Sequence, residues 1–420
     1  MRIGCRIAAG LCATLAAAAL TAAGAAPAGA APAAEASARL VNTSARPMAT
    51  TNGRVNALLY VDGTVYVGGK FSSLTFHRKI HARHNLGAVS SATGAPIAFS
   101  PKINGQVHSL ALSPDKSVLY VGGAFTRVGR FARKDVAAFS IATKKLLNFA
   151  PKVAGTVLTI AVTSSGVYLG GTFRVVNGKR RTFAAEVARD GALLPWAPRL
   201  DGRVRALLVS PDGTRMFLGG GFHHVNRRAD EALAAVGLAS GASARFNRKL
   251  MPTFRRRGRF SQVTSFATDG NLIFAGAEGT GQGVFDGTLA FRPKTGRLVW
   301  RNRCLGATQA VLYLNGVLYK ASHAHDCSRS GGFRQIRPGW HAHHLMAEAP
   351  GSGKLLRWGT SAMAGPNPLP DTNGGLGTGL GPFALATDGT QLFVGGEFTT
   401  VNDKAQEGLT RFGGIARSAV

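Results

Sequence analysis

Basic side chains dominate the segments that separate the apolar stretches of this chain. The sequence has 50 lysines and arginines against 20 acidic residues, and its formal net charge is +30. Guanidinium groups that converge on one surface bind sulfate, phosphate or carboxylate groups through forked hydrogen bonds. The candidate anion-binding residues are Arg78, Lys79, Arg83, Arg130, Arg133, Arg180, Arg181, Arg227, Arg228, Arg255, Arg256 and Arg257. The alternative is that they are solvated charges on exposed loops.

Trp340 is a further candidate ligand-binding residue. It lies outside the repeated aromatic positions of the chain, between Arg337 and His341. An indole ring has a large apolar face and a polar N–H group, so it can serve as a platform for a sugar ring. A tryptophan in a loop can equally cover the edge of a sheet, and both interpretations stay open on the sequence.

Two groups of histidines lie close in the sequence, His323 and His325 in the first and His341 and His343 in the second. Imidazole groups beside a carboxylate can hold zinc or another divalent ion. A segment separates the two groups, however, and their spacing matches no established metal motif. We therefore expect solvated histidines, keep these four as weak metal candidates, and expect no cofactor.

One segment of the chain returns several times with small changes. The stretch LYVDGTVYVGGKF ends at Phe71, and similar stretches end at Phe125, Phe173, Phe222 and Phe398. The Gly-Gly pairs begin at Gly68, Gly122, Gly170, Gly219 and Gly395, with degenerate copies at Gly276 and Ala321. The first spacings are 54, 48 and 49 residues. Periods near 50 residues that are made of strands are typical of β-propellers.

Each copy contains the signals of four short strands. An alternating apolar stretch is followed by a tight turn, often Asp-Gly or Asn-Gly, which supplies the positive φ angles of a two-residue hairpin. The Gly-Gly strand, a third apolar stretch and a last stretch that ends in an aromatic residue complete the copy. The pattern predicts an all-β fold, a seven-bladed β-propeller of four-stranded antiparallel blades. We expect the Gly-Gly pair to mark a sharp bend or a close approach of two backbones.

The last copy lacks one strand. It runs from Phe383 to Phe412 and has three strand signals instead of four. Residues 40–45 precede the first copy and are expected to supply the missing strand. An N-terminal strand would then complete the last blade and close the ring, which leaves no open edge between blades.

The first residues have the composition of an export signal. Arg2 and Arg6 precede an alanine-rich apolar run, and small residues follow it. We predict a secretory signal peptide over residues 1–30, an Ala/Pro-rich linker over 31–39, the propeller over 40–412 and a C-terminal tail over 413–420. A retained membrane anchor is the alternative. No later stretch reaches the roughly 18 apolar residues that a membrane span needs.

Export makes the cysteines informative. Cys5 and Cys12 lie within the predicted signal peptide, which leaves Cys304 and Cys327 as an even pair in an oxidising compartment. We therefore expect an extracellular protein with a disulfide bond between these two residues. Two free thiols are the alternative.

The repeats resemble those of secreted actinobacterial proteins that carry delta-60-type repeats, a family of β-propellers. The shared motif is an aromatic residue, Val or Leu, Gly-Gly, any residue and Phe, followed three residues later by Val or Leu. In this chain those later positions are Leu74, Val128, Val176, Val225 and Val401. The resemblance covers about residues 40–412, and it implies the fold and export rather than a reaction.

One copy also resembles a special blade of that family, in which a cysteine precedes the first strand and a histidine and a second cysteine follow the second glycine. Cys304, His323 and Cys327 match these positions. The resemblance implies that the two cysteines bracket one hairpin. The chain departs from the motif at Ala321 and Ser322, which replace the glycines.

The fold predicts where the charge lies. In a four-stranded blade, the loops after strands two and four fall on one face of the disc. These loops are the longer and more basic ones here, so we expect positive charge on one face, around the mouth of the central channel.

We predict a secreted, non-enzymatic binding or scaffold module that is a monomer. Its expected partner is an anionic polysaccharide or cell-wall polymer, or an extracellular protein. Nucleic acid is not expected, because the protein is predicted to be exported and its basic loops contain few aromatic residues for stacking on bases.

Two alternatives remain. A carbohydrate-active hydrolase or lyase would have its site at the channel mouth, where Glu278 and Glu397 end second strands. A glycosidase needs two cooperating carboxylates that flank the bond, and no spacing in the sequence favours this pair. The other alternative is a structural protein without a ligand.

Overall fold

Short antiparallel strands make up almost all of the regular structure in the part of the chain that the computed structural model describes. The described residues are 38–246, 250–252, 260–280, 284–302, 304–334, 343–358, 381–402 and 404–414. They belong to one unit, Ser37–Val420, so the predicted signal peptide lies outside them. Within these ranges the one helix is the 3-10 turn η1 (Ser328–Ser330), and no helix is long and apolar enough to span a membrane.

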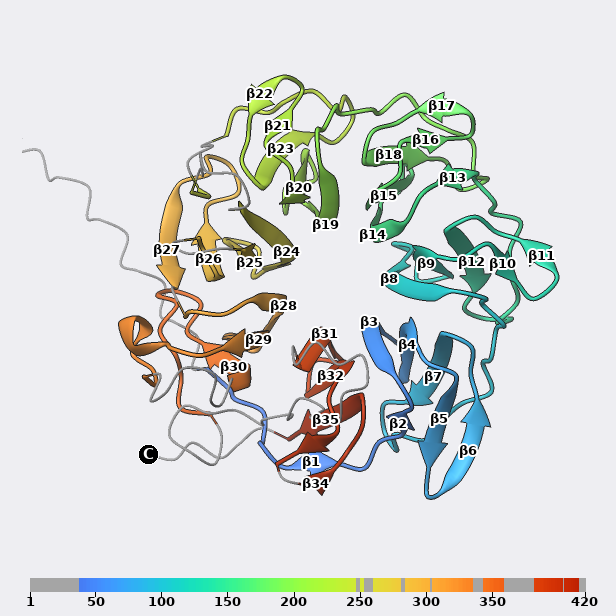
Figure 1. Cartoon of the computed structure of the whole chain (residues 1–420), viewed down its shortest axis with the longest axis vertical. Helices are drawn as coiled ribbons and strands as arrows, with labels where there is room; N and C mark the ends of the chain where they lie inside the picture. The colour runs from blue at the N-terminus through green and yellow to red at the C-terminus, as the bar shows by residue number, and fades with distance from the viewer. Residues whose placement is uncertain are drawn as a thin grey trace, which may run out of the picture. The chain divides into compact units, whose positions relative to one another are not determined.

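Seven sheets of the described ranges are built alike, and in Figure 1 the first strand of each lies nearest the centre of the view. The first strands are β3 (Arg54–Val61), β8 (Gln106–Leu112), β14 (Val157–Val162), β19 (Arg203–Val209), β24 (Phe260–Thr268), β28 (Thr308–Leu314) and β31 (Gly381–Thr387). Each packs against the first strand of the following sheet, and β31 packs against β3. The core is therefore formed between sheets, where one sheet covers the face of the next.

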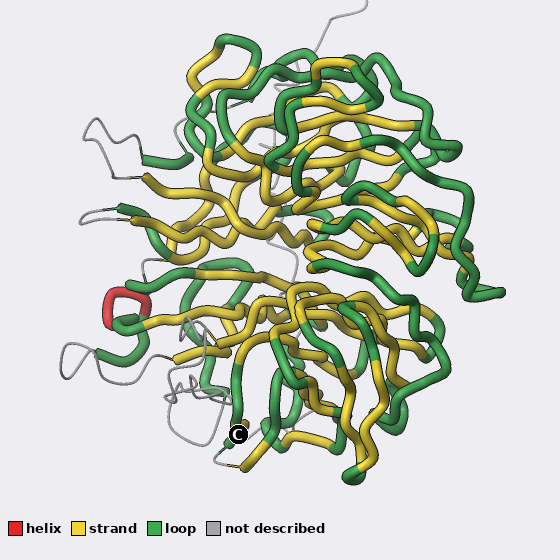
Figure 2. The backbone as a smooth tube through the Cα atoms, turned by 45° about the vertical axis from the view of Figure 1, so that its right-hand side comes forward, coloured by secondary structure: helices red, strands yellow, loops and turns green. Residues whose placement is uncertain are grey.

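The second and third strands follow outward as an antiparallel meander. The second strands are β4 (Thr64–Lys70), β9 (Val118–Ala124), β15 (Val167–Gly171), β20 (Arg215–Gly221), β25 (Ile273–Thr280), β29 (Val317–Ala324) and β32 (Gln391–Glu397). The third strands are β7 (Leu86–Ser90), β12 (Val136–Ser140), β18 (Ala184–Val187), β23 (Leu233–Gly237), β26 (Gly287–Phe291), β30 (His343–Glu348) and β35 (Leu409–Gly413). Figure 2 shows the strands side by side, with loops at their ends.

The fourth strand is shorter than predicted in most of these sheets. As far as the described residues show, a fourth strand is present only as β27 (Leu298–Asn302) and, in the last sheet, as the two-residue strand β1 (Ala45–Arg46). Elsewhere a single bridge remains, such as Val89 with Pro96. The physical reason is the aromatic residue that follows: Phe99 turns inward and meets Tyr66 edge to face at 5.3 Å, which carries the chain out of the sheet.

The N-terminal segment pairs with the last sheet. Ala45 is opposite Phe412, and Arg46 is opposite Arg411. The N–H group of Asn42 donates a hydrogen bond to the carbonyl oxygen of Gly414 at 2.8 Å. The two ends of the described chain therefore meet in one antiparallel pair.

Each first strand contains a β-bulge at the same place. In the first copy the register shifts between Val55 and Ala57, so that Asn56 is the extra residue. The corresponding bulge residues are Asn56, His108, Leu158, Arg205, Thr264, Gln309 and Phe383. A bulge re-aims the side chain that it carries, so the repeat directs one residue of every sheet out of the regular alternation.

The Gly-Gly pair is explained by two close approaches. A Cβ atom on Gly68 would lie 2.5 Å from Cγ1 of Val107, which projects from the next sheet. A Cβ atom on Gly69 would lie 2.1 Å from the carbonyl oxygen of Arg54, at the bulge of its own sheet. Neither glycine has a positive φ angle. The pair therefore marks close packing of two kinds rather than a sharp bend.

The predicted disulfide bond between Cys304 and Cys327 is present, and both residues are fully buried. Cys304 precedes β28 and Cys327 follows β29. The bond therefore ties together the two ends of one hairpin, as the resemblance implied.

Asp135 gives a prediction about pH and stability. It lies just before β12 with a φ of 64°, and its carboxylate accepts the N–H of Phe125 at 3.0 Å. Burial raises the pKa of Asp135 to about 6, although the Phe125 N–H acts in the opposite direction. Because the folded state binds this proton more tightly than the unfolded chain, stability is lost as the pH rises from about 4 to about 6.

Asp135→Asn is expected to remove that loss. Asn85 occupies the corresponding place before β7 with a φ of 63°, so the backbone there accepts asparagine. We expect the variant to unfold with a free energy about 1–2 kcal/mol higher at pH 7, after allowance for solvent screening. At pH 4 the two proteins should be equal, which denaturant unfolding at both pH values measures. An equal difference at both pH values would contradict this explanation.

Candidate functional site

Small hairpins form where the sequence was expected to form loops. They follow the second strands, and some of them pair with the segment that leads into the first strand of the same copy. Their strands are β2 (Thr50–Thr51), β5 (Ser73–Phe76), β6 (Lys79–Ala82), β10 (Arg127–Val128), β11 (Phe131–Ala132), β13 (Val153–Ala154), β16 (Val175–Val176), β17 (Lys179–Arg180), β21 (His224–Val225), β22 (Arg228–Ala229), β33 (Thr400–Val401) and β34 (Lys404–Ala405). Asn177 and Gly178 have φ angles of 48° and 76°, so an Asn-Gly turn was the overlooked signal.

The tips of these hairpins carry the exposed basic residues. We define the basic rim as Arg78, Lys79, Arg130, Arg180 and Arg227, all of which are exposed. Figure 1 places β6, β11, β17 and β22 at the outer edge of the sheets, away from the centre. The expectation that these charges surround the channel mouth is therefore corrected: the hairpins carry them outward. A polymer that contacts several of them would cross the outer part of the molecule.

Four other predicted site residues have their guanidinium groups engaged within the fold. Nη2 of Arg83 donates to the carbonyl oxygen of Ile97 at 2.8 Å, and Nη1 donates to that of Ala82. The same pattern repeats at Arg133 and Arg181, and Arg228 donates to a carbonyl oxygen at 3.5 Å. Burial lowers the pKa of Arg83 and of Arg133. These arginines hold each hairpin to the turn beyond the third strand, so we leave them out of the basic rim.

Five predicted residues lie outside the described ranges: Arg255, Arg256, Arg257, Trp340 and His341. Of the remaining metal candidates, His323 and His325 have ring centroids 4.3 Å apart, while His343 packs on Phe333. Burial, and then the charges of His325 and His344, lower the pKa of His323 to about 4. No group of three or more His, Cys, Asp or Glu residues that could hold a metal occurs in the described part of the chain.

Charged side chains of first and second strands contact one another in two groups. We define the axial cluster as Arg54, His108, Arg203, Arg205, Glu278 and Glu397. Nη1 of Arg205 lies 2.5 Å from Oε1 of Glu278, and Gln309 donates to the other oxygen at 2.9 Å. Arg203 donates two hydrogen bonds to Gln262, which in turn donates to Glu278. One network thus joins three consecutive sheets.

The second part of the axial cluster joins the first and last sheets. Nη1 of Arg54 lies 3.7 Å from Oε2 of Glu397, and its guanidinium stands over the ring of Phe383 at 5.2 Å. His108 is affected by one arginine of each part: burial, and then the charges of Arg54 and Arg205, lower its pKa to about 4. At neutral pH the imidazole is therefore uncharged. The cluster holds three guanidinium groups against two carboxylates, and its excess charge is positive.

Two of the six residues of the axial cluster were named from the sequence. Glu278 and Glu397 were expected to face the channel, and both belong to the cluster. Arg54, Arg203 and Arg205 were overlooked. The sequence did contain a signal for these arginines. Each is adjacent to the valine that recurs in the first strands, at positions where the residue type changes from copy to copy.

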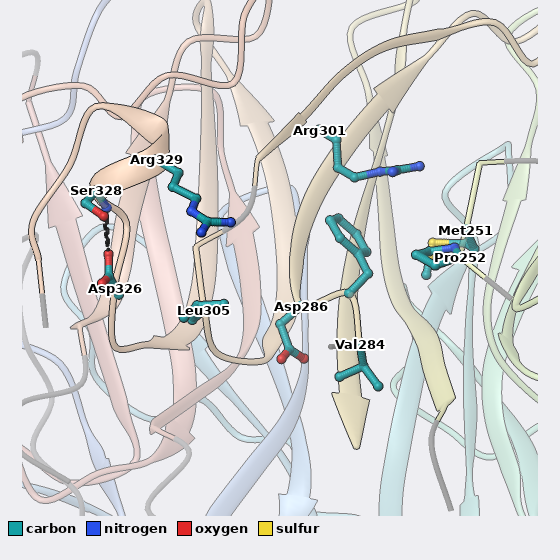
Figure 3. Close-up of a pocket in the computed structure, with 10 residues that line it drawn as sticks. Met251, Pro252, Val284, Asp286, Arg301, Leu305, Asp326, Ser328 and Arg329 are labelled. Carbon is teal, nitrogen blue, oxygen red and sulfur yellow. Dashed lines mark hydrogen bonds between the residues drawn. The ribbon is translucent and has the colours of Figure 1, made fainter. Parts of the chain in front are cut away.

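A cavity of about 590 Å³ opens between the sheets that begin with β24 and β28 (Figure 3). This volume lies in the range of small-molecule sites. Its lining residues are Met251, Pro252, Val284, Phe285, Asp286, Arg301, Leu305, Asp326, Ser328 and Arg329. Figure 3 shows Arg301 and Arg329 on different walls, with Asp286 below them. Charged and apolar groups are thus mixed around one space, as in sites for polar ligands.

Two carboxyl groups of this cavity differ in their surroundings. The carboxylate of Asp326 accepts hydrogen bonds from the N–H and the hydroxyl group of Ser328. Burial, and then the charge of Glu278, raise the pKa of Asp286 to about 6, although the Gly279 N–H acts against this. Near pH 6 the Asp286 carboxyl is therefore present in both its protonated and its ionised form.

Comparison with known proteins agrees with the sheet architecture. A family model described as the Rax2 C-terminal beta propeller domain matches residues 83–190. A structure of the computationally designed Ika8 protein is 14% identical and covers 89% of this chain and 100% of its own, with a TM-score of 0.48. A structure titled mitotic checkpoint complex is 14% identical and covers 92% and 100%, with a TM-score of 0.50. No curated protein matches. The repeated antiparallel sheets and the family match together identify a β-propeller domain in this chain.

Proposed function

We propose that this protein is an extracellular binding module whose basic rim holds an anionic polysaccharide or cell-wall polymer. The observation that supports this most is the basic rim itself. Arg130, Arg180 and Arg227 are exposed on successive hairpins of similar build. A chain with regularly spaced carboxylate, sulfate or phosphate groups can contact several such tips at once. Each contact is weak alone, and their sum gives useful affinity.

We further propose that the seven sheets are the seven blades of a closed ring of the delta-60-repeat type. Contact of β31 with β3 and the pairing of β1 with β35 support closure. The buried disulfide bond fits an exported protein, as does the predicted signal peptide.

The test compares two triple variants of equal charge. Arg130, Arg180 and Arg227 are changed to Gln in the rim variant. Lys294, Arg297 and Lys354, which are exposed in the segments that follow the third strands β26 and β30, are changed to Gln in the control. We expect the rim variant to bind a model polyanion such as polygalacturonate roughly tenfold more weakly at low salt. The control variant should keep most of its affinity.

Ionic strength gives the second measurement. Binding by the natural protein should weaken steadily as salt rises, because exposed charges are screened over about 10 Å at 0.1 M. The rim variant should show a shallower salt dependence than the control. Equal affinity of the two variants, or binding that salt does not change, would show that the basic rim is not the binding surface.

A further inference from the structure

Two charged residues lie where another copy of the repeat buries apolar side chains. Lys320 on β29 and Glu348 on β30 are fully buried. By strand register, Val67 stands at the place of Lys320 in the first copy, and Val89 stands at the place of Glu348. Packing of the fold therefore does not require these charges, and an ion pair without access to water is costly to keep. The pair calls for an explanation other than packing.

An amine and an amide meet at the carboxylate of Glu348. Nζ of Lys320 lies 2.7 Å from Oε1 of Glu348, and Nδ2 of Asn302 donates a hydrogen bond to the same oxygen at 2.6 Å. The hydroxyl group of Thr288 donates to Oε2 at 2.7 Å and holds the carboxylate from its other side. Nζ and Nδ2 are therefore no farther apart than the sum of the two contacts to Oε1. Groups held together in this way react as parts of one molecule rather than by encounter.

We propose that Lys320 and Asn302 form an isopeptide bond, a covalent amide link between the sheets that begin with β24 and β28. Nζ of Lys320 forms a bond to Cγ of Asn302, the bond from Cγ to Nδ2 breaks, and ammonia leaves. No oxidant, reductant or cofactor takes part. The ion pair of Lys320 with Glu348 is the state before the reaction. The link does not depend on the basic rim or on the function proposed above.

Glu348 can move every proton that this reaction requires. Its carboxylate first accepts a proton from the ammonium group of Lys320, which leaves a neutral amine as the nucleophile. After the attack, the carboxyl group gives its proton to the departing nitrogen and accepts a further proton from Nζ. The products are an amide, ammonia and a protonated carboxyl group, so the buried ion pair is gone. Apart from Glu348, Nζ has no partner among the described residues that would hold the amine back.

The amide of Asn302 is held in position for the attack. Its carbonyl oxygen accepts the N–H group of Cys304 at 2.9 Å and the hydroxyl group of Ser330 at 2.6 Å. Two donors on this oxygen polarise the carbonyl group and stabilise the negative charge of a tetrahedral intermediate. Nδ2 donates to Glu348 and to the carbonyl oxygen of Gly353 at 2.8 Å, so the leaving nitrogen faces its proton donor.

The proposed bond lies beside the disulfide bond. Asn302 precedes Cys304 closely in the sequence, and Lys320 precedes Cys327. While the disulfide bond is intact, the isopeptide bond closes only a small additional ring, so it adds little to the free energy of unfolding. After reduction of the disulfide bond, it would still join β27 to β29.

Peptide mapping by mass spectrometry of the purified, reduced protein tests the proposal. We expect one peptide that joins the segment of Asn302 to the segment of Lys320, lighter than the two linear peptides together by one ammonia molecule. Trypsin should fail to cleave after Lys320, because its amine is acylated. This measurement needs no variant, so it remains informative if a substitution at this buried site prevents folding. Separate linear peptides and normal cleavage after Lys320 would overturn the proposal and leave an ion pair only.

Two variants test the chemistry. Lys320→Arg keeps a positive charge beside Glu348 but has no amine, so the link should be lost. A succinimide formed at an asparagine elsewhere also releases ammonia, but that loss would persist in Lys320→Arg. Glu348→Gln keeps an acceptor for Asn302 and cannot carry protons, so it should also lack the link. Lys354→Gln, at an exposed lysine after β30, is the matched control and should keep it. A link that forms equally in Glu348→Gln would contradict the proton transfer assigned to Glu348.

Discussion

Lys320→Leu is expected to lower the free energy of unfolding by about 3–5 kcal/mol. Nζ of Lys320 lies 2.7 Å from Oε1 of Glu348, and neither side chain is exposed. Glu348 also accepts hydrogen bonds from Thr288 and Asn302. Removal of the ammonium group leaves a buried carboxylate without its counter-charge, which costs far more than the ion pair contributes. Denaturant unfolding with the disulfide bond intact measures the loss.

A double variant provides the control. Glu348→Gln added to Lys320→Leu removes the orphaned charge and keeps an acceptor for Asn302, so most of the lost stability should return. Other copies carry apolar residues at the place of Lys320, such as Val67 and Leu169, and leucine fits a place of this kind. A double variant that is no more stable than Lys320→Leu would show that the damage comes from packing rather than charge.

Gly123→Ala is expected to destabilise the protein by about 3 kcal/mol, at the upper end of the range for overpacked sites. The new Cβ atom would lie 2.1 Å from the carbonyl oxygen of Gln106. That oxygen belongs to a strand backbone at a β-bulge, so two paired strands would have to separate. Thermal and denaturant unfolding measure the effect.

The neighbouring glycine gives a matched comparison. A Cβ atom on Gly122 would lie 2.7 Å from Cγ1 of Val157, a side-chain atom of the next sheet. Val157→Ala should therefore rescue part of the loss in Gly122→Ala and none of the loss in Gly123→Ala. A double-mutant cycle measures both couplings. Equal rescue of both glycine variants would contradict the two distinct roles of the pair.

The repeated architecture was predictable because each signal recurs. The Gly-Gly strands, the Asp-Gly turns and the apolar first strands occur in the same order in successive copies. A weak strand signal in one copy can therefore be assigned by comparison with the others. The pairing of Cys304 with Cys327 followed from the predicted export signal, which leaves a single pair of cysteines. The hairpins at the edge were overlooked because their strands are as short as Val175–Val176, too short for any alternation to show.

The site residues were harder to predict because residue type does not reveal what a side chain faces. Arg83 and Arg78 lie five residues apart in one basic segment, yet the first is buried on carbonyl groups and the second is exposed. Arg205 is a bulge residue, and neither amino-acid composition nor hydrophobic periodicity reveals where a strand contains a bulge. Lys320 is a charged residue at a position where other copies are apolar, and only the neighbouring Glu348 explains it.

The pairing of Ala45 with Phe412 has a mechanical consequence. The first and last sheet-forming segments therefore lie side by side in one sheet. A tether attached to either of these two segments would therefore hold the domain at the same place. Tension applied between these two segments would load this short ladder together with the hydrogen bonds of Val41 to Tyr319 and Trp358, so the N-terminal segment would act as a latch.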